Sequence, residues 1–276
     1  MKFIETIKGF MYDYRYKVPS NAGICFAYYL IMAIFPIASL CAFLASLFEF
    51  DLSLLTALLN KYLQPEFSSL ITNVLMNNNL NTMSLIVFFI SIFVVSRGVS
   101  QLYTISKNMF PPTHERTTLL EELFTIGKTL GVIVLLILII VILAIFPIFA
   151  QSLSQSHHFI IDEIILFFIF YTILFLLYKI IPDVHVNIVD IGIGSIVASV
   201  LLVIVLNILE VYFGLADYNT VYGPLASVVV IMISFSIVAE VIYFGMYVMF
   251  ESHMLRLVKE MEDQYNISVR KKKSRI

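Results

Sequence analysis

Long apolar runs dominate this sequence, and polar residues are largely confined to the stretches between them. Each run reaches about 20 residues, the length that a helix needs to cross the hydrocarbon core of a bilayer. A helix also satisfies every backbone amide internally, which lipid cannot do. The pattern therefore predicts an all-α polytopic membrane protein. Its six expected transmembrane helices cover residues of about 22–48, 81–103, 130–150, 159–181, 188–213 and 225–250.

The segment before the first run has a different, amphipathic pattern. Its apolar residues recur at helical spacing between lysines and are Phe3, Ile4, Ile7, Phe10, Met11 and Tyr14. This spacing predicts a helix over residues 1–17 that lies along the membrane surface. We expect one membrane domain over residues 1–264, with residues 251–264 continuing the last span, and a flexible basic tail over residues 265–276.

The composition agrees with a membrane protein. The chain is 60% hydrophobic and 13% charged, whereas a soluble domain is about 45–50% apolar and about 25% charged. This balance excludes a soluble globular enzyme, a disordered chain and a nucleic-acid-binding domain. No His, Cys, Asp and Glu residues stand at metal-ligand spacing. We therefore expect no metal, no cofactor and no nucleic-acid partner.

The basic residues are unevenly distributed around the predicted spans. Of the 17 lysines and arginines, 16 flank ends that would face the same side of the membrane, and Lys61 alone lies on the other side. Basic residues are retained on the cytoplasmic side, so both termini are expected in the cytoplasm. The tail ends in a basic cluster, Arg270, Lys271, Lys272, Lys273 and Arg275. We expect this cluster to contact anionic inner-leaflet lipid; a topology anchor alone is the alternative.

Among the ionisable residues of the predicted spans, three are taken to lie at membrane depth, where a charge is costly and usually faces protein or a cavity. They are Arg97, Glu210 and Glu240. At 1.5 Å per residue, Arg97 lies about 24 Å and Glu240 about 22 Å from the outer ends of their spans. This similar depth predicts that the two residues face each other or share a polar cavity. A structural ion pair and a substrate or proton-coupling site both stay open as interpretations.

Further polar residues extend this candidate site along three spans. Spacings of four, three and four residues place Ser236, Glu240, Tyr243 and Tyr247 on one face of the sixth span. Asn207 and Glu210 share a face of the fifth span with small residues, which also permit close helix packing. The first span brings Tyr28 and Tyr29 to the inner third. The candidate substrate or coupling residues are Arg97, Glu240, Tyr243, Tyr247, Ser236, Asn207, Glu210, Tyr28 and Tyr29.

Several short motifs, in this order and spacing, are similar to those of a known family. They are Ala27-Tyr-Tyr-Leu with Phe35-Pro36, Ser96-Arg97-Gly98-Val99 with Lys107-Asn108, Leu177-Tyr178-Lys179 with Pro182-Asp183, and Tyr218-Asn219 with Tyr222-Gly223 and Leu225. Over roughly residues 10–252 the chain resembles the YihY/BrkB family. The resemblance implies a bacterial inner-membrane protein with about six helices and no settled activity, in a family that has carried the labels ribonuclease BN and virulence factor.

One departure from the family pattern concerns an acidic residue. The resemblance leads us to expect Gly-Ala-Glu near the end of the last span, but this chain has Gly245-Met246-Tyr247. Glu240 lies seven residues before Tyr247, about two helical turns, and therefore on the same face. It is a candidate relocated acid.

Three functions are compatible with these features. The leading hypothesis is a transporter or lipid-translocating protein of the cell envelope, because polar stripes and ionisable residues line the spans. The alternative is a non-transporting scaffold that binds lipids or protein partners. A membrane-embedded enzyme is the third, although no nucleophile or metal site accompanies Glu240 and Tyr243. We expect no enzymatic activity, including that of the ribonuclease label.

Overall fold

The computed structural model consists of α-helices wherever the chain is described. It describes residues 2–32, 82–111, 158–215 and 223–273, with short helical pieces between residues 56 and 73 and between 123 and 132. The long helices are α1 (Lys2–Lys17), α5 (Thr82–Met109), α7 (His158–Ile180), α8 (Ile188–Leu215) and α9 (Gly223–Lys273). A shorter apolar helix covers Ala22–Met32.

Local sequence explains where these helices begin and end. Pro19 follows α1 and separates it from the Ala22–Met32 helix, because proline cannot continue the hydrogen-bond ladder. Pro182 lies in the short connection from α7 to α8. At the start of α8, the side-chain oxygen of Asn187 accepts a 3.1 Å hydrogen bond from the Val189 amide. Asn187 therefore caps α8 at its N-terminus.

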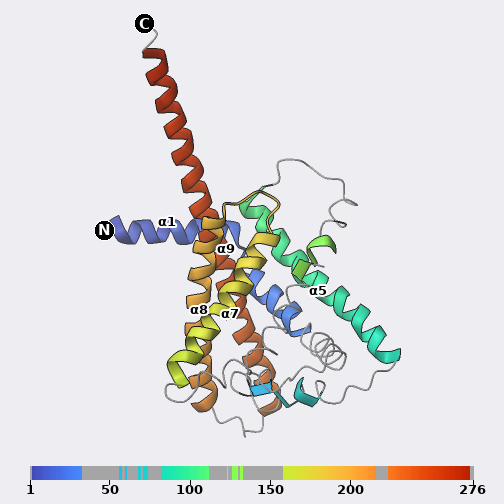
Figure 1. The fold of residues 1–276 in the computed structure, drawn as a ribbon. Coiled ribbons are helices and arrows are strands. Elements are labelled where there is room, and N and C mark those ends of the chain that lie inside the picture. Colours follow the sequence, from blue (N-terminus) through green and yellow to red (C-terminus); the bar gives the residue numbers. More distant parts are fainter. Residues whose placement is uncertain are drawn as a thin grey trace.

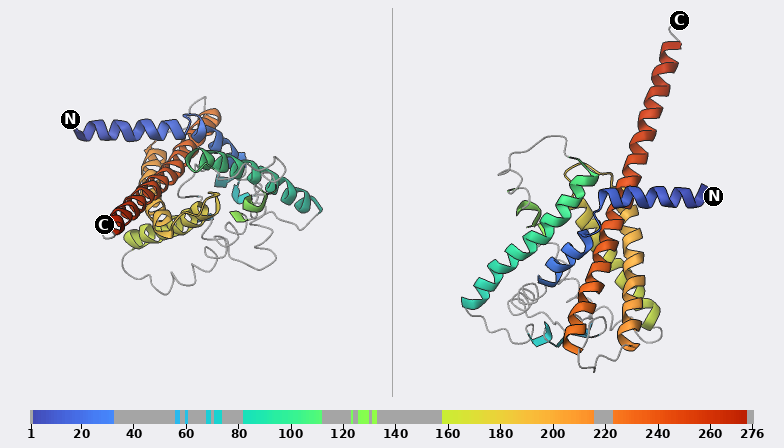
Figure 2. Two further views of the ribbon diagram at one scale, coloured as in Figure 1. Left: turned by 90° about the horizontal axis from the view of Figure 1, so that it is seen from above. Right: turned by 180° about the vertical axis from the view of Figure 1, so that it is seen from behind.

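The three C-terminal helices form the best-packed part of the molecule. α8 packs against α9 on one side and α7 on the other, and the three run roughly alongside one another (Figure 1). α5 and the Ala22–Met32 helix lie against α9 on another side (Figure 2). The core between them is filled by bulky, fully buried side chains such as Tyr178, Tyr243 and Met246.

Three of the six expected spans are helices long and apolar enough to cross a membrane: Glu163–Ile180, Ile188–Tyr212 and Val229–Ile267. They correspond to the predicted fourth, fifth and sixth spans. α5 covers the predicted second span, and Ala22–Met32 covers the beginning of the first. Most of the predicted third span, 130–150, lies outside the described residues, as does the remainder of the first. The count of six therefore stays a prediction.

The two termini lie toward the same end of the bundle (Figure 1). α1 crosses α9 at a steep angle, whereas α9 continues straight past this crossing. α9 continues as a helix as far as Lys273, past residue 265 where the flexible tail is expected to begin, and the flexibility of this segment stays a prediction. The helix continues this far because no glycine or proline follows Gly245, and the segment is rich in good helix formers such as Leu, Met, Lys and Glu. We call residues 251–273 the C-terminal arm.

Candidate functional site

The carboxylate of Glu240, within the apolar part of α9, is bound by two residues of α1. The Tyr14 hydroxyl donates a 2.7 Å hydrogen bond to Glu240 Oε2. Arg15 Nη1 lies 3.2 Å from Glu240 Oε1 in an ion pair. The side chains of Arg15 and Glu240 are 47% and 28% exposed, so solvent or lipid reaches this pair. Burial, and then the hydrogen bond to Glu240, raise the pKa of Tyr14 above its ordinary value.

Gly23 provides the space that the Glu240 side chain occupies. A Cβ atom at this position would lie 2.9 Å from Glu240 Cγ and 3.2 Å from the backbone oxygen of Ser236. The Ala22–Met32 helix therefore packs its backbone directly against this turn of α9. One turn further along each helix, the rings of Phe26 and Tyr243 are 5.8 Å apart. Glu240 is thus held between α1 and the Ala22–Met32 helix.

Aromatic side chains of α1 and α9 pack together next to the Tyr14–Glu240 contact. Tyr14 packs edge-on against Phe244 and Tyr247, with ring centroids 5.7 Å and 5.4 Å apart. Phe10, one turn earlier on α1, packs against Tyr247 at 4.9 Å. Tyr14 therefore contacts both Tyr247, where the family pattern has an acid, and Glu240, the candidate relocated acid. This geometry places both positions on the face of α9 that α1 covers.

The structure gives Arg97 and Glu240 different partners. Arg97 is exposed on α5, where its guanidinium carbon lies 5.1 Å from the centroid of the Phe93 ring. Within the described residues, no ion pair or hydrogen bond joins it to Glu240, whose cationic partner is Arg15. The expectation that Arg97 and Glu240 face each other or share a polar cavity therefore stays a prediction. The Ala22–Met32 helix packs against both elements, through Gly23 on α9 and through Tyr29 against Gly98 of α5.

The other predicted site residues lie at several places. Ser236, Tyr243 and Tyr247 accompany Glu240 on α9, facing α1 and the Ala22–Met32 helix. Asn207 instead donates a 3.1 Å hydrogen bond to Glu163 of α7. The remaining residues are half-buried Glu210 on α8, half-buried Tyr29 and exposed Tyr28.

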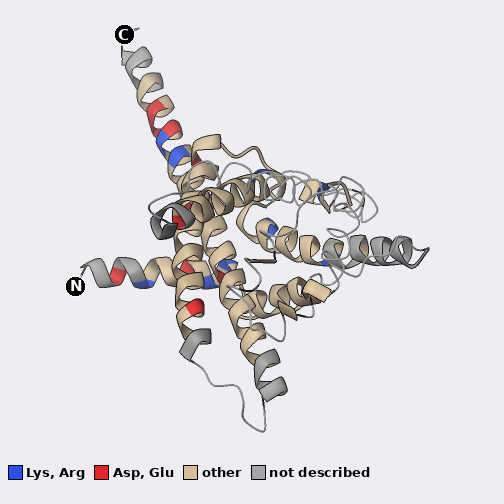
Figure 3. Cartoon of the chain, turned by 60° about the horizontal axis from the view of Figure 1, so that its bottom comes forward, with Lys and Arg blue, Asp and Glu red and all other residues tan. Residues whose placement is uncertain are grey.

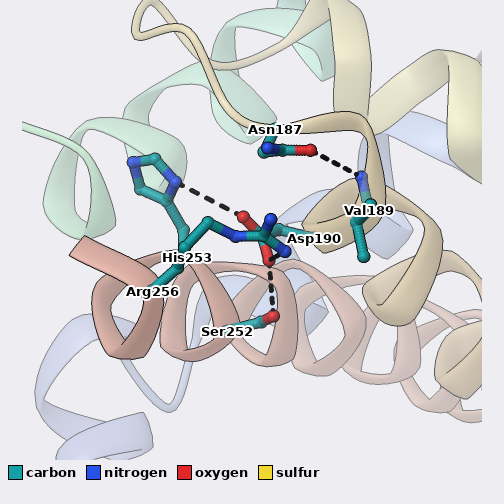
Figure 4. Close-up of polar contacts among 6 residues, drawn as sticks. All are labelled: Asn187, Val189, Asp190, Ser252, His253 and Arg256. Carbon is teal, nitrogen blue, oxygen red and sulfur yellow. Dashed lines mark hydrogen bonds and ion pairs between the residues drawn. The ribbon is translucent and has the colours of Figure 1, made fainter. Parts of the chain in front are cut away.

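A second polar cluster joins α8 to the start of the C-terminal arm (Figure 4). Asp190, in the first turn of α8, is fully buried. Its Oδ1 accepts hydrogen bonds from Ser252 (2.7 Å) and Arg256 (2.8 Å). His253 Nδ1 lies 3.6 Å from the other oxygen, Oδ2, too far for a hydrogen bond. Ser252 bonds to Asp190 rather than to His253, so the group does not form a nucleophile–base pair.

A third cluster ties the α7–α8 connection to neighbouring helices. Lys128 Nζ lies 2.7 Å from Asp183 Oδ1, and both side chains are nearly buried. The Tyr103 hydroxyl of α5 also donates a hydrogen bond to Asp183. Asp183 belongs to the Pro-Asp motif of the resemblance, and here it holds helices together. Figure 3 shows the described charged residues gathered near α1, the C-terminal arm and the helix ends, with most of the bundle uncharged.

Sequence reasoning missed Tyr14, Arg15 and the Asp190 cluster. The sequence pattern indicates only a membrane-surface role for Tyr14 and a topology role for Arg15, and more than 200 residues separate them from Glu240. Asp190 lies three residues after the cap of α8, at the beginning of the predicted fifth span, and the sequence analysis does not single it out. Its detectable signal was the pattern Asn187-x-x-Asp190, an N-cap followed by an acid in the first turn, which the helix dipole favours.

The described helices define a helical membrane protein, and two of its polar clusters lie where α1 and the C-terminal arm meet the other long helices. Its sequence matches the family Virulence factor BrkB over residues 17–265, which is most of the chain. The protein belongs to this family, and the resemblance found in its motifs is confirmed. A search of curated proteins and a search of solved structures returned no match.

Proposed function

We propose that this BrkB-family protein is a transporter or lipid-translocating protein of a bacterial inner membrane, with Glu240 at the centre of its polar site and no enzymatic activity. One observation carries the proposal: a carboxylate inside a spanning helix is partly exposed and is bound by α1 rather than by another span. A charge at this depth is costly unless it serves a pathway or a partner. The distribution of basic residues supports cytoplasmic termini, with α1 on the inner leaflet.

The alternative is a scaffold that binds a protein partner through the C-terminal arm. The arm exposes Met254, Val258, Met261 and Tyr265. Their spacing of four, three and four residues places them on one helix face. In that case the polar contacts around Glu240 only fix the packing of α1.

The two functions differ in a lipid-transfer assay. Purified protein is reconstituted into vesicles that contain headgroup-labelled fluorescent lipid, and a membrane-impermeant reductant reports transfer between leaflets. We expect the wild-type protein to accelerate lipid transfer, and we expect the rate for Glu240→Gln to be at least about ten-fold lower. Glu260→Gln is the matched control, because it removes an exposed carboxylate from the same helix. Equal rates for wild type, Glu240→Gln and protein-free vesicles would support the scaffold.

A further inference from the structure

The Arg15–Glu240 ion pair stands out because its two charges are accessible while the groups beneath it are buried. Tyr14, Tyr243 and Tyr247 are each at most 3% exposed. An exposed ion pair contributes only about 0–1 kcal/mol to stability. This small contribution does not offset the cost of placing a carboxylate within a span. A ligand with charges of both signs would supply the missing stabilisation.

The pair lies where α1, the expected membrane-surface helix, crosses α9, and we take it to be within reach of lipid headgroups. α1 lies across the end of the α9 span, and the C-terminal arm continues beyond it (Figure 2). Tyr12 and Tyr16 of α1 are 74% and 81% exposed. Exposed tyrosines on an amphipathic surface helix are typical of the membrane interface. Arg15 lies between these two tyrosines in the sequence.

We propose that Arg15 and Glu240 form a binding site for the zwitterionic headgroup of an aminophospholipid, with the phosphate on Arg15 and the primary ammonium on Glu240. This inference rests on the proposed function and names the substrate class of its site. The planar guanidinium binds phosphate through paired hydrogen bonds. The Glu240 carboxylate accepts hydrogen bonds from an ammonium group. Its Oε1 atom faces Arg15, and this atom becomes available to the ammonium group when the lipid phosphate binds the Arg15 guanidinium.

The surroundings of Glu240 favour a primary ammonium over a quaternary one. A quaternary ammonium is recognised by open aromatic faces. Here the Tyr14 ring packs edge-on against Phe244 and Tyr247, and both Tyr14 and Tyr247 are buried. The accessible group is the carboxylate itself, which suits a cation that donates hydrogen bonds.

Native mass spectrometry of the full-length protein tests this site. The protein is offered equal amounts of phosphatidylethanolamine, phosphatidylcholine and phosphatidylglycerol. We expect the wild-type protein to retain phosphatidylethanolamine. In Arg15→Gln and in Glu240→Gln, the abundance of this adduct should fall at least about ten-fold. The abundance of phosphatidylglycerol adducts should not change. Lys8→Gln is the matched control, because it removes an exposed positive charge from the same helix. Thermal unfolding in detergent identifies variants that fail to fold. Arg15 is half-exposed, so we expect Arg15→Gln to leave the packing of the buried residues around it unchanged.

Three results would overturn the inference. Equal retention of phosphatidylcholine would exclude the primary ammonium as the recognised group. Equal losses in Lys8→Gln and Arg15→Gln would show general attraction to α1. Retention in both Arg15→Gln and Glu240→Gln would place the lipid elsewhere. Selective binding without accelerated lipid transfer would leave the site standing and reject only the proposed transport.

Discussion

Asp190 is the most completely enclosed charge among the described residues, and it lies at a helix junction. Ser252 and Arg256 both donate to one of its oxygens, and the N-terminal end of α8 adds a favourable dipole. Asp190 Oδ2 and His253 Nδ1 have no hydrogen-bond partner within the described residues. The carboxylate therefore depends on Ser252 and Arg256 to offset its removal from water.

Replacing Asp190 by Asn tests this dependence. Breaking a buried ion pair from one side typically costs about 3–5 kcal/mol, because the remaining charge is left uncompensated. Arg256 is 32% exposed and can still be hydrated, so we expect a loss toward the lower end of this range. Thermal unfolding in detergent measures the loss. Arg256→Gln should cost more than Asp190→Asn, because it leaves a fully buried carboxylate behind; the reverse order would contradict this account.

The sequence identified Glu240 because an ionisable residue is rare within an apolar run. It could not identify Tyr14 and Arg15 as its partners, because their contact depends on how α1 crosses α9. Depth alone suggested Arg97, and depth carries no information about the direction in which a helix faces. The unusual position of Glu240 was therefore readable from the sequence, whereas its partner required the packing of helices.

At the scale of elements, the crossing of α8 and α9 depends on two glycines. A Cβ at Gly194 would lie 2.6 Å from the backbone oxygen of Gly245, and one at Gly245 would lie 2.4 Å from Ala198 Cβ. The Tyr178 hydroxyl reaches the same place from α7 and donates a 2.6 Å hydrogen bond to the Ile242 oxygen. Small residues allow this approach of helix backbones.

Gly192 and Gly194 form a matched pair for testing this crossing. Gly194→Ala forces the two backbones apart, and we expect a loss of about 1–3 kcal/mol, the typical cost of overpacking. Gly192→Ala meets only the Tyr171 hydroxyl at 3.7 Å, an ordinary contact. It should be neutral or stabilising by up to about 1 kcal/mol, because alanine favours helix over glycine. Similar unfolding temperatures for the two variants would show that the close approach does not determine stability.

The helices themselves were readable from hydrophobic pattern. α1, α7 and α8 agree with the predicted 1–17, 159–181 and 188–213 to within two residues at each end. The hydrophobic pattern does not predict the end of α9. A membrane span ends where its apolar run ends, whereas the helix can continue until a helix-breaking residue occurs. The C-terminal arm is the consequence.

At the scale of the molecule, the arm changes where the basic cluster lies. If the arm stands upright as a straight helix, the 20 residues from Phe250 to Arg270 separate these two positions by about 30 Å. The Debye length at physiological salt is only about 8 Å. Basic residues that far from the surface feel little attraction to anionic lipid, whereas a flexible tail would let them reach it. The upright arm thus predicts weaker lipid contact than the sequence alone suggested.

Energy transfer from a fluorophore at position 272 to headgroup-labelled lipid distinguishes the two arrangements. With a donor–acceptor pair whose Förster distance is shorter than the arm, we expect an upright arm to give a transfer efficiency in reconstituted vesicles that is low and unchanged by anionic lipid or by salt. The same fluorophore at position 16, on exposed α1, should give high efficiency in every condition and serves as the control. If the arm leans onto the bilayer, efficiency at position 272 will rise with anionic lipid and fall with salt, since the attraction of its basic residues is screened. That outcome would restore the basic cluster as a lipid contact and would require α9 to bend beyond Arg256, where its attachment to Asp190 ends.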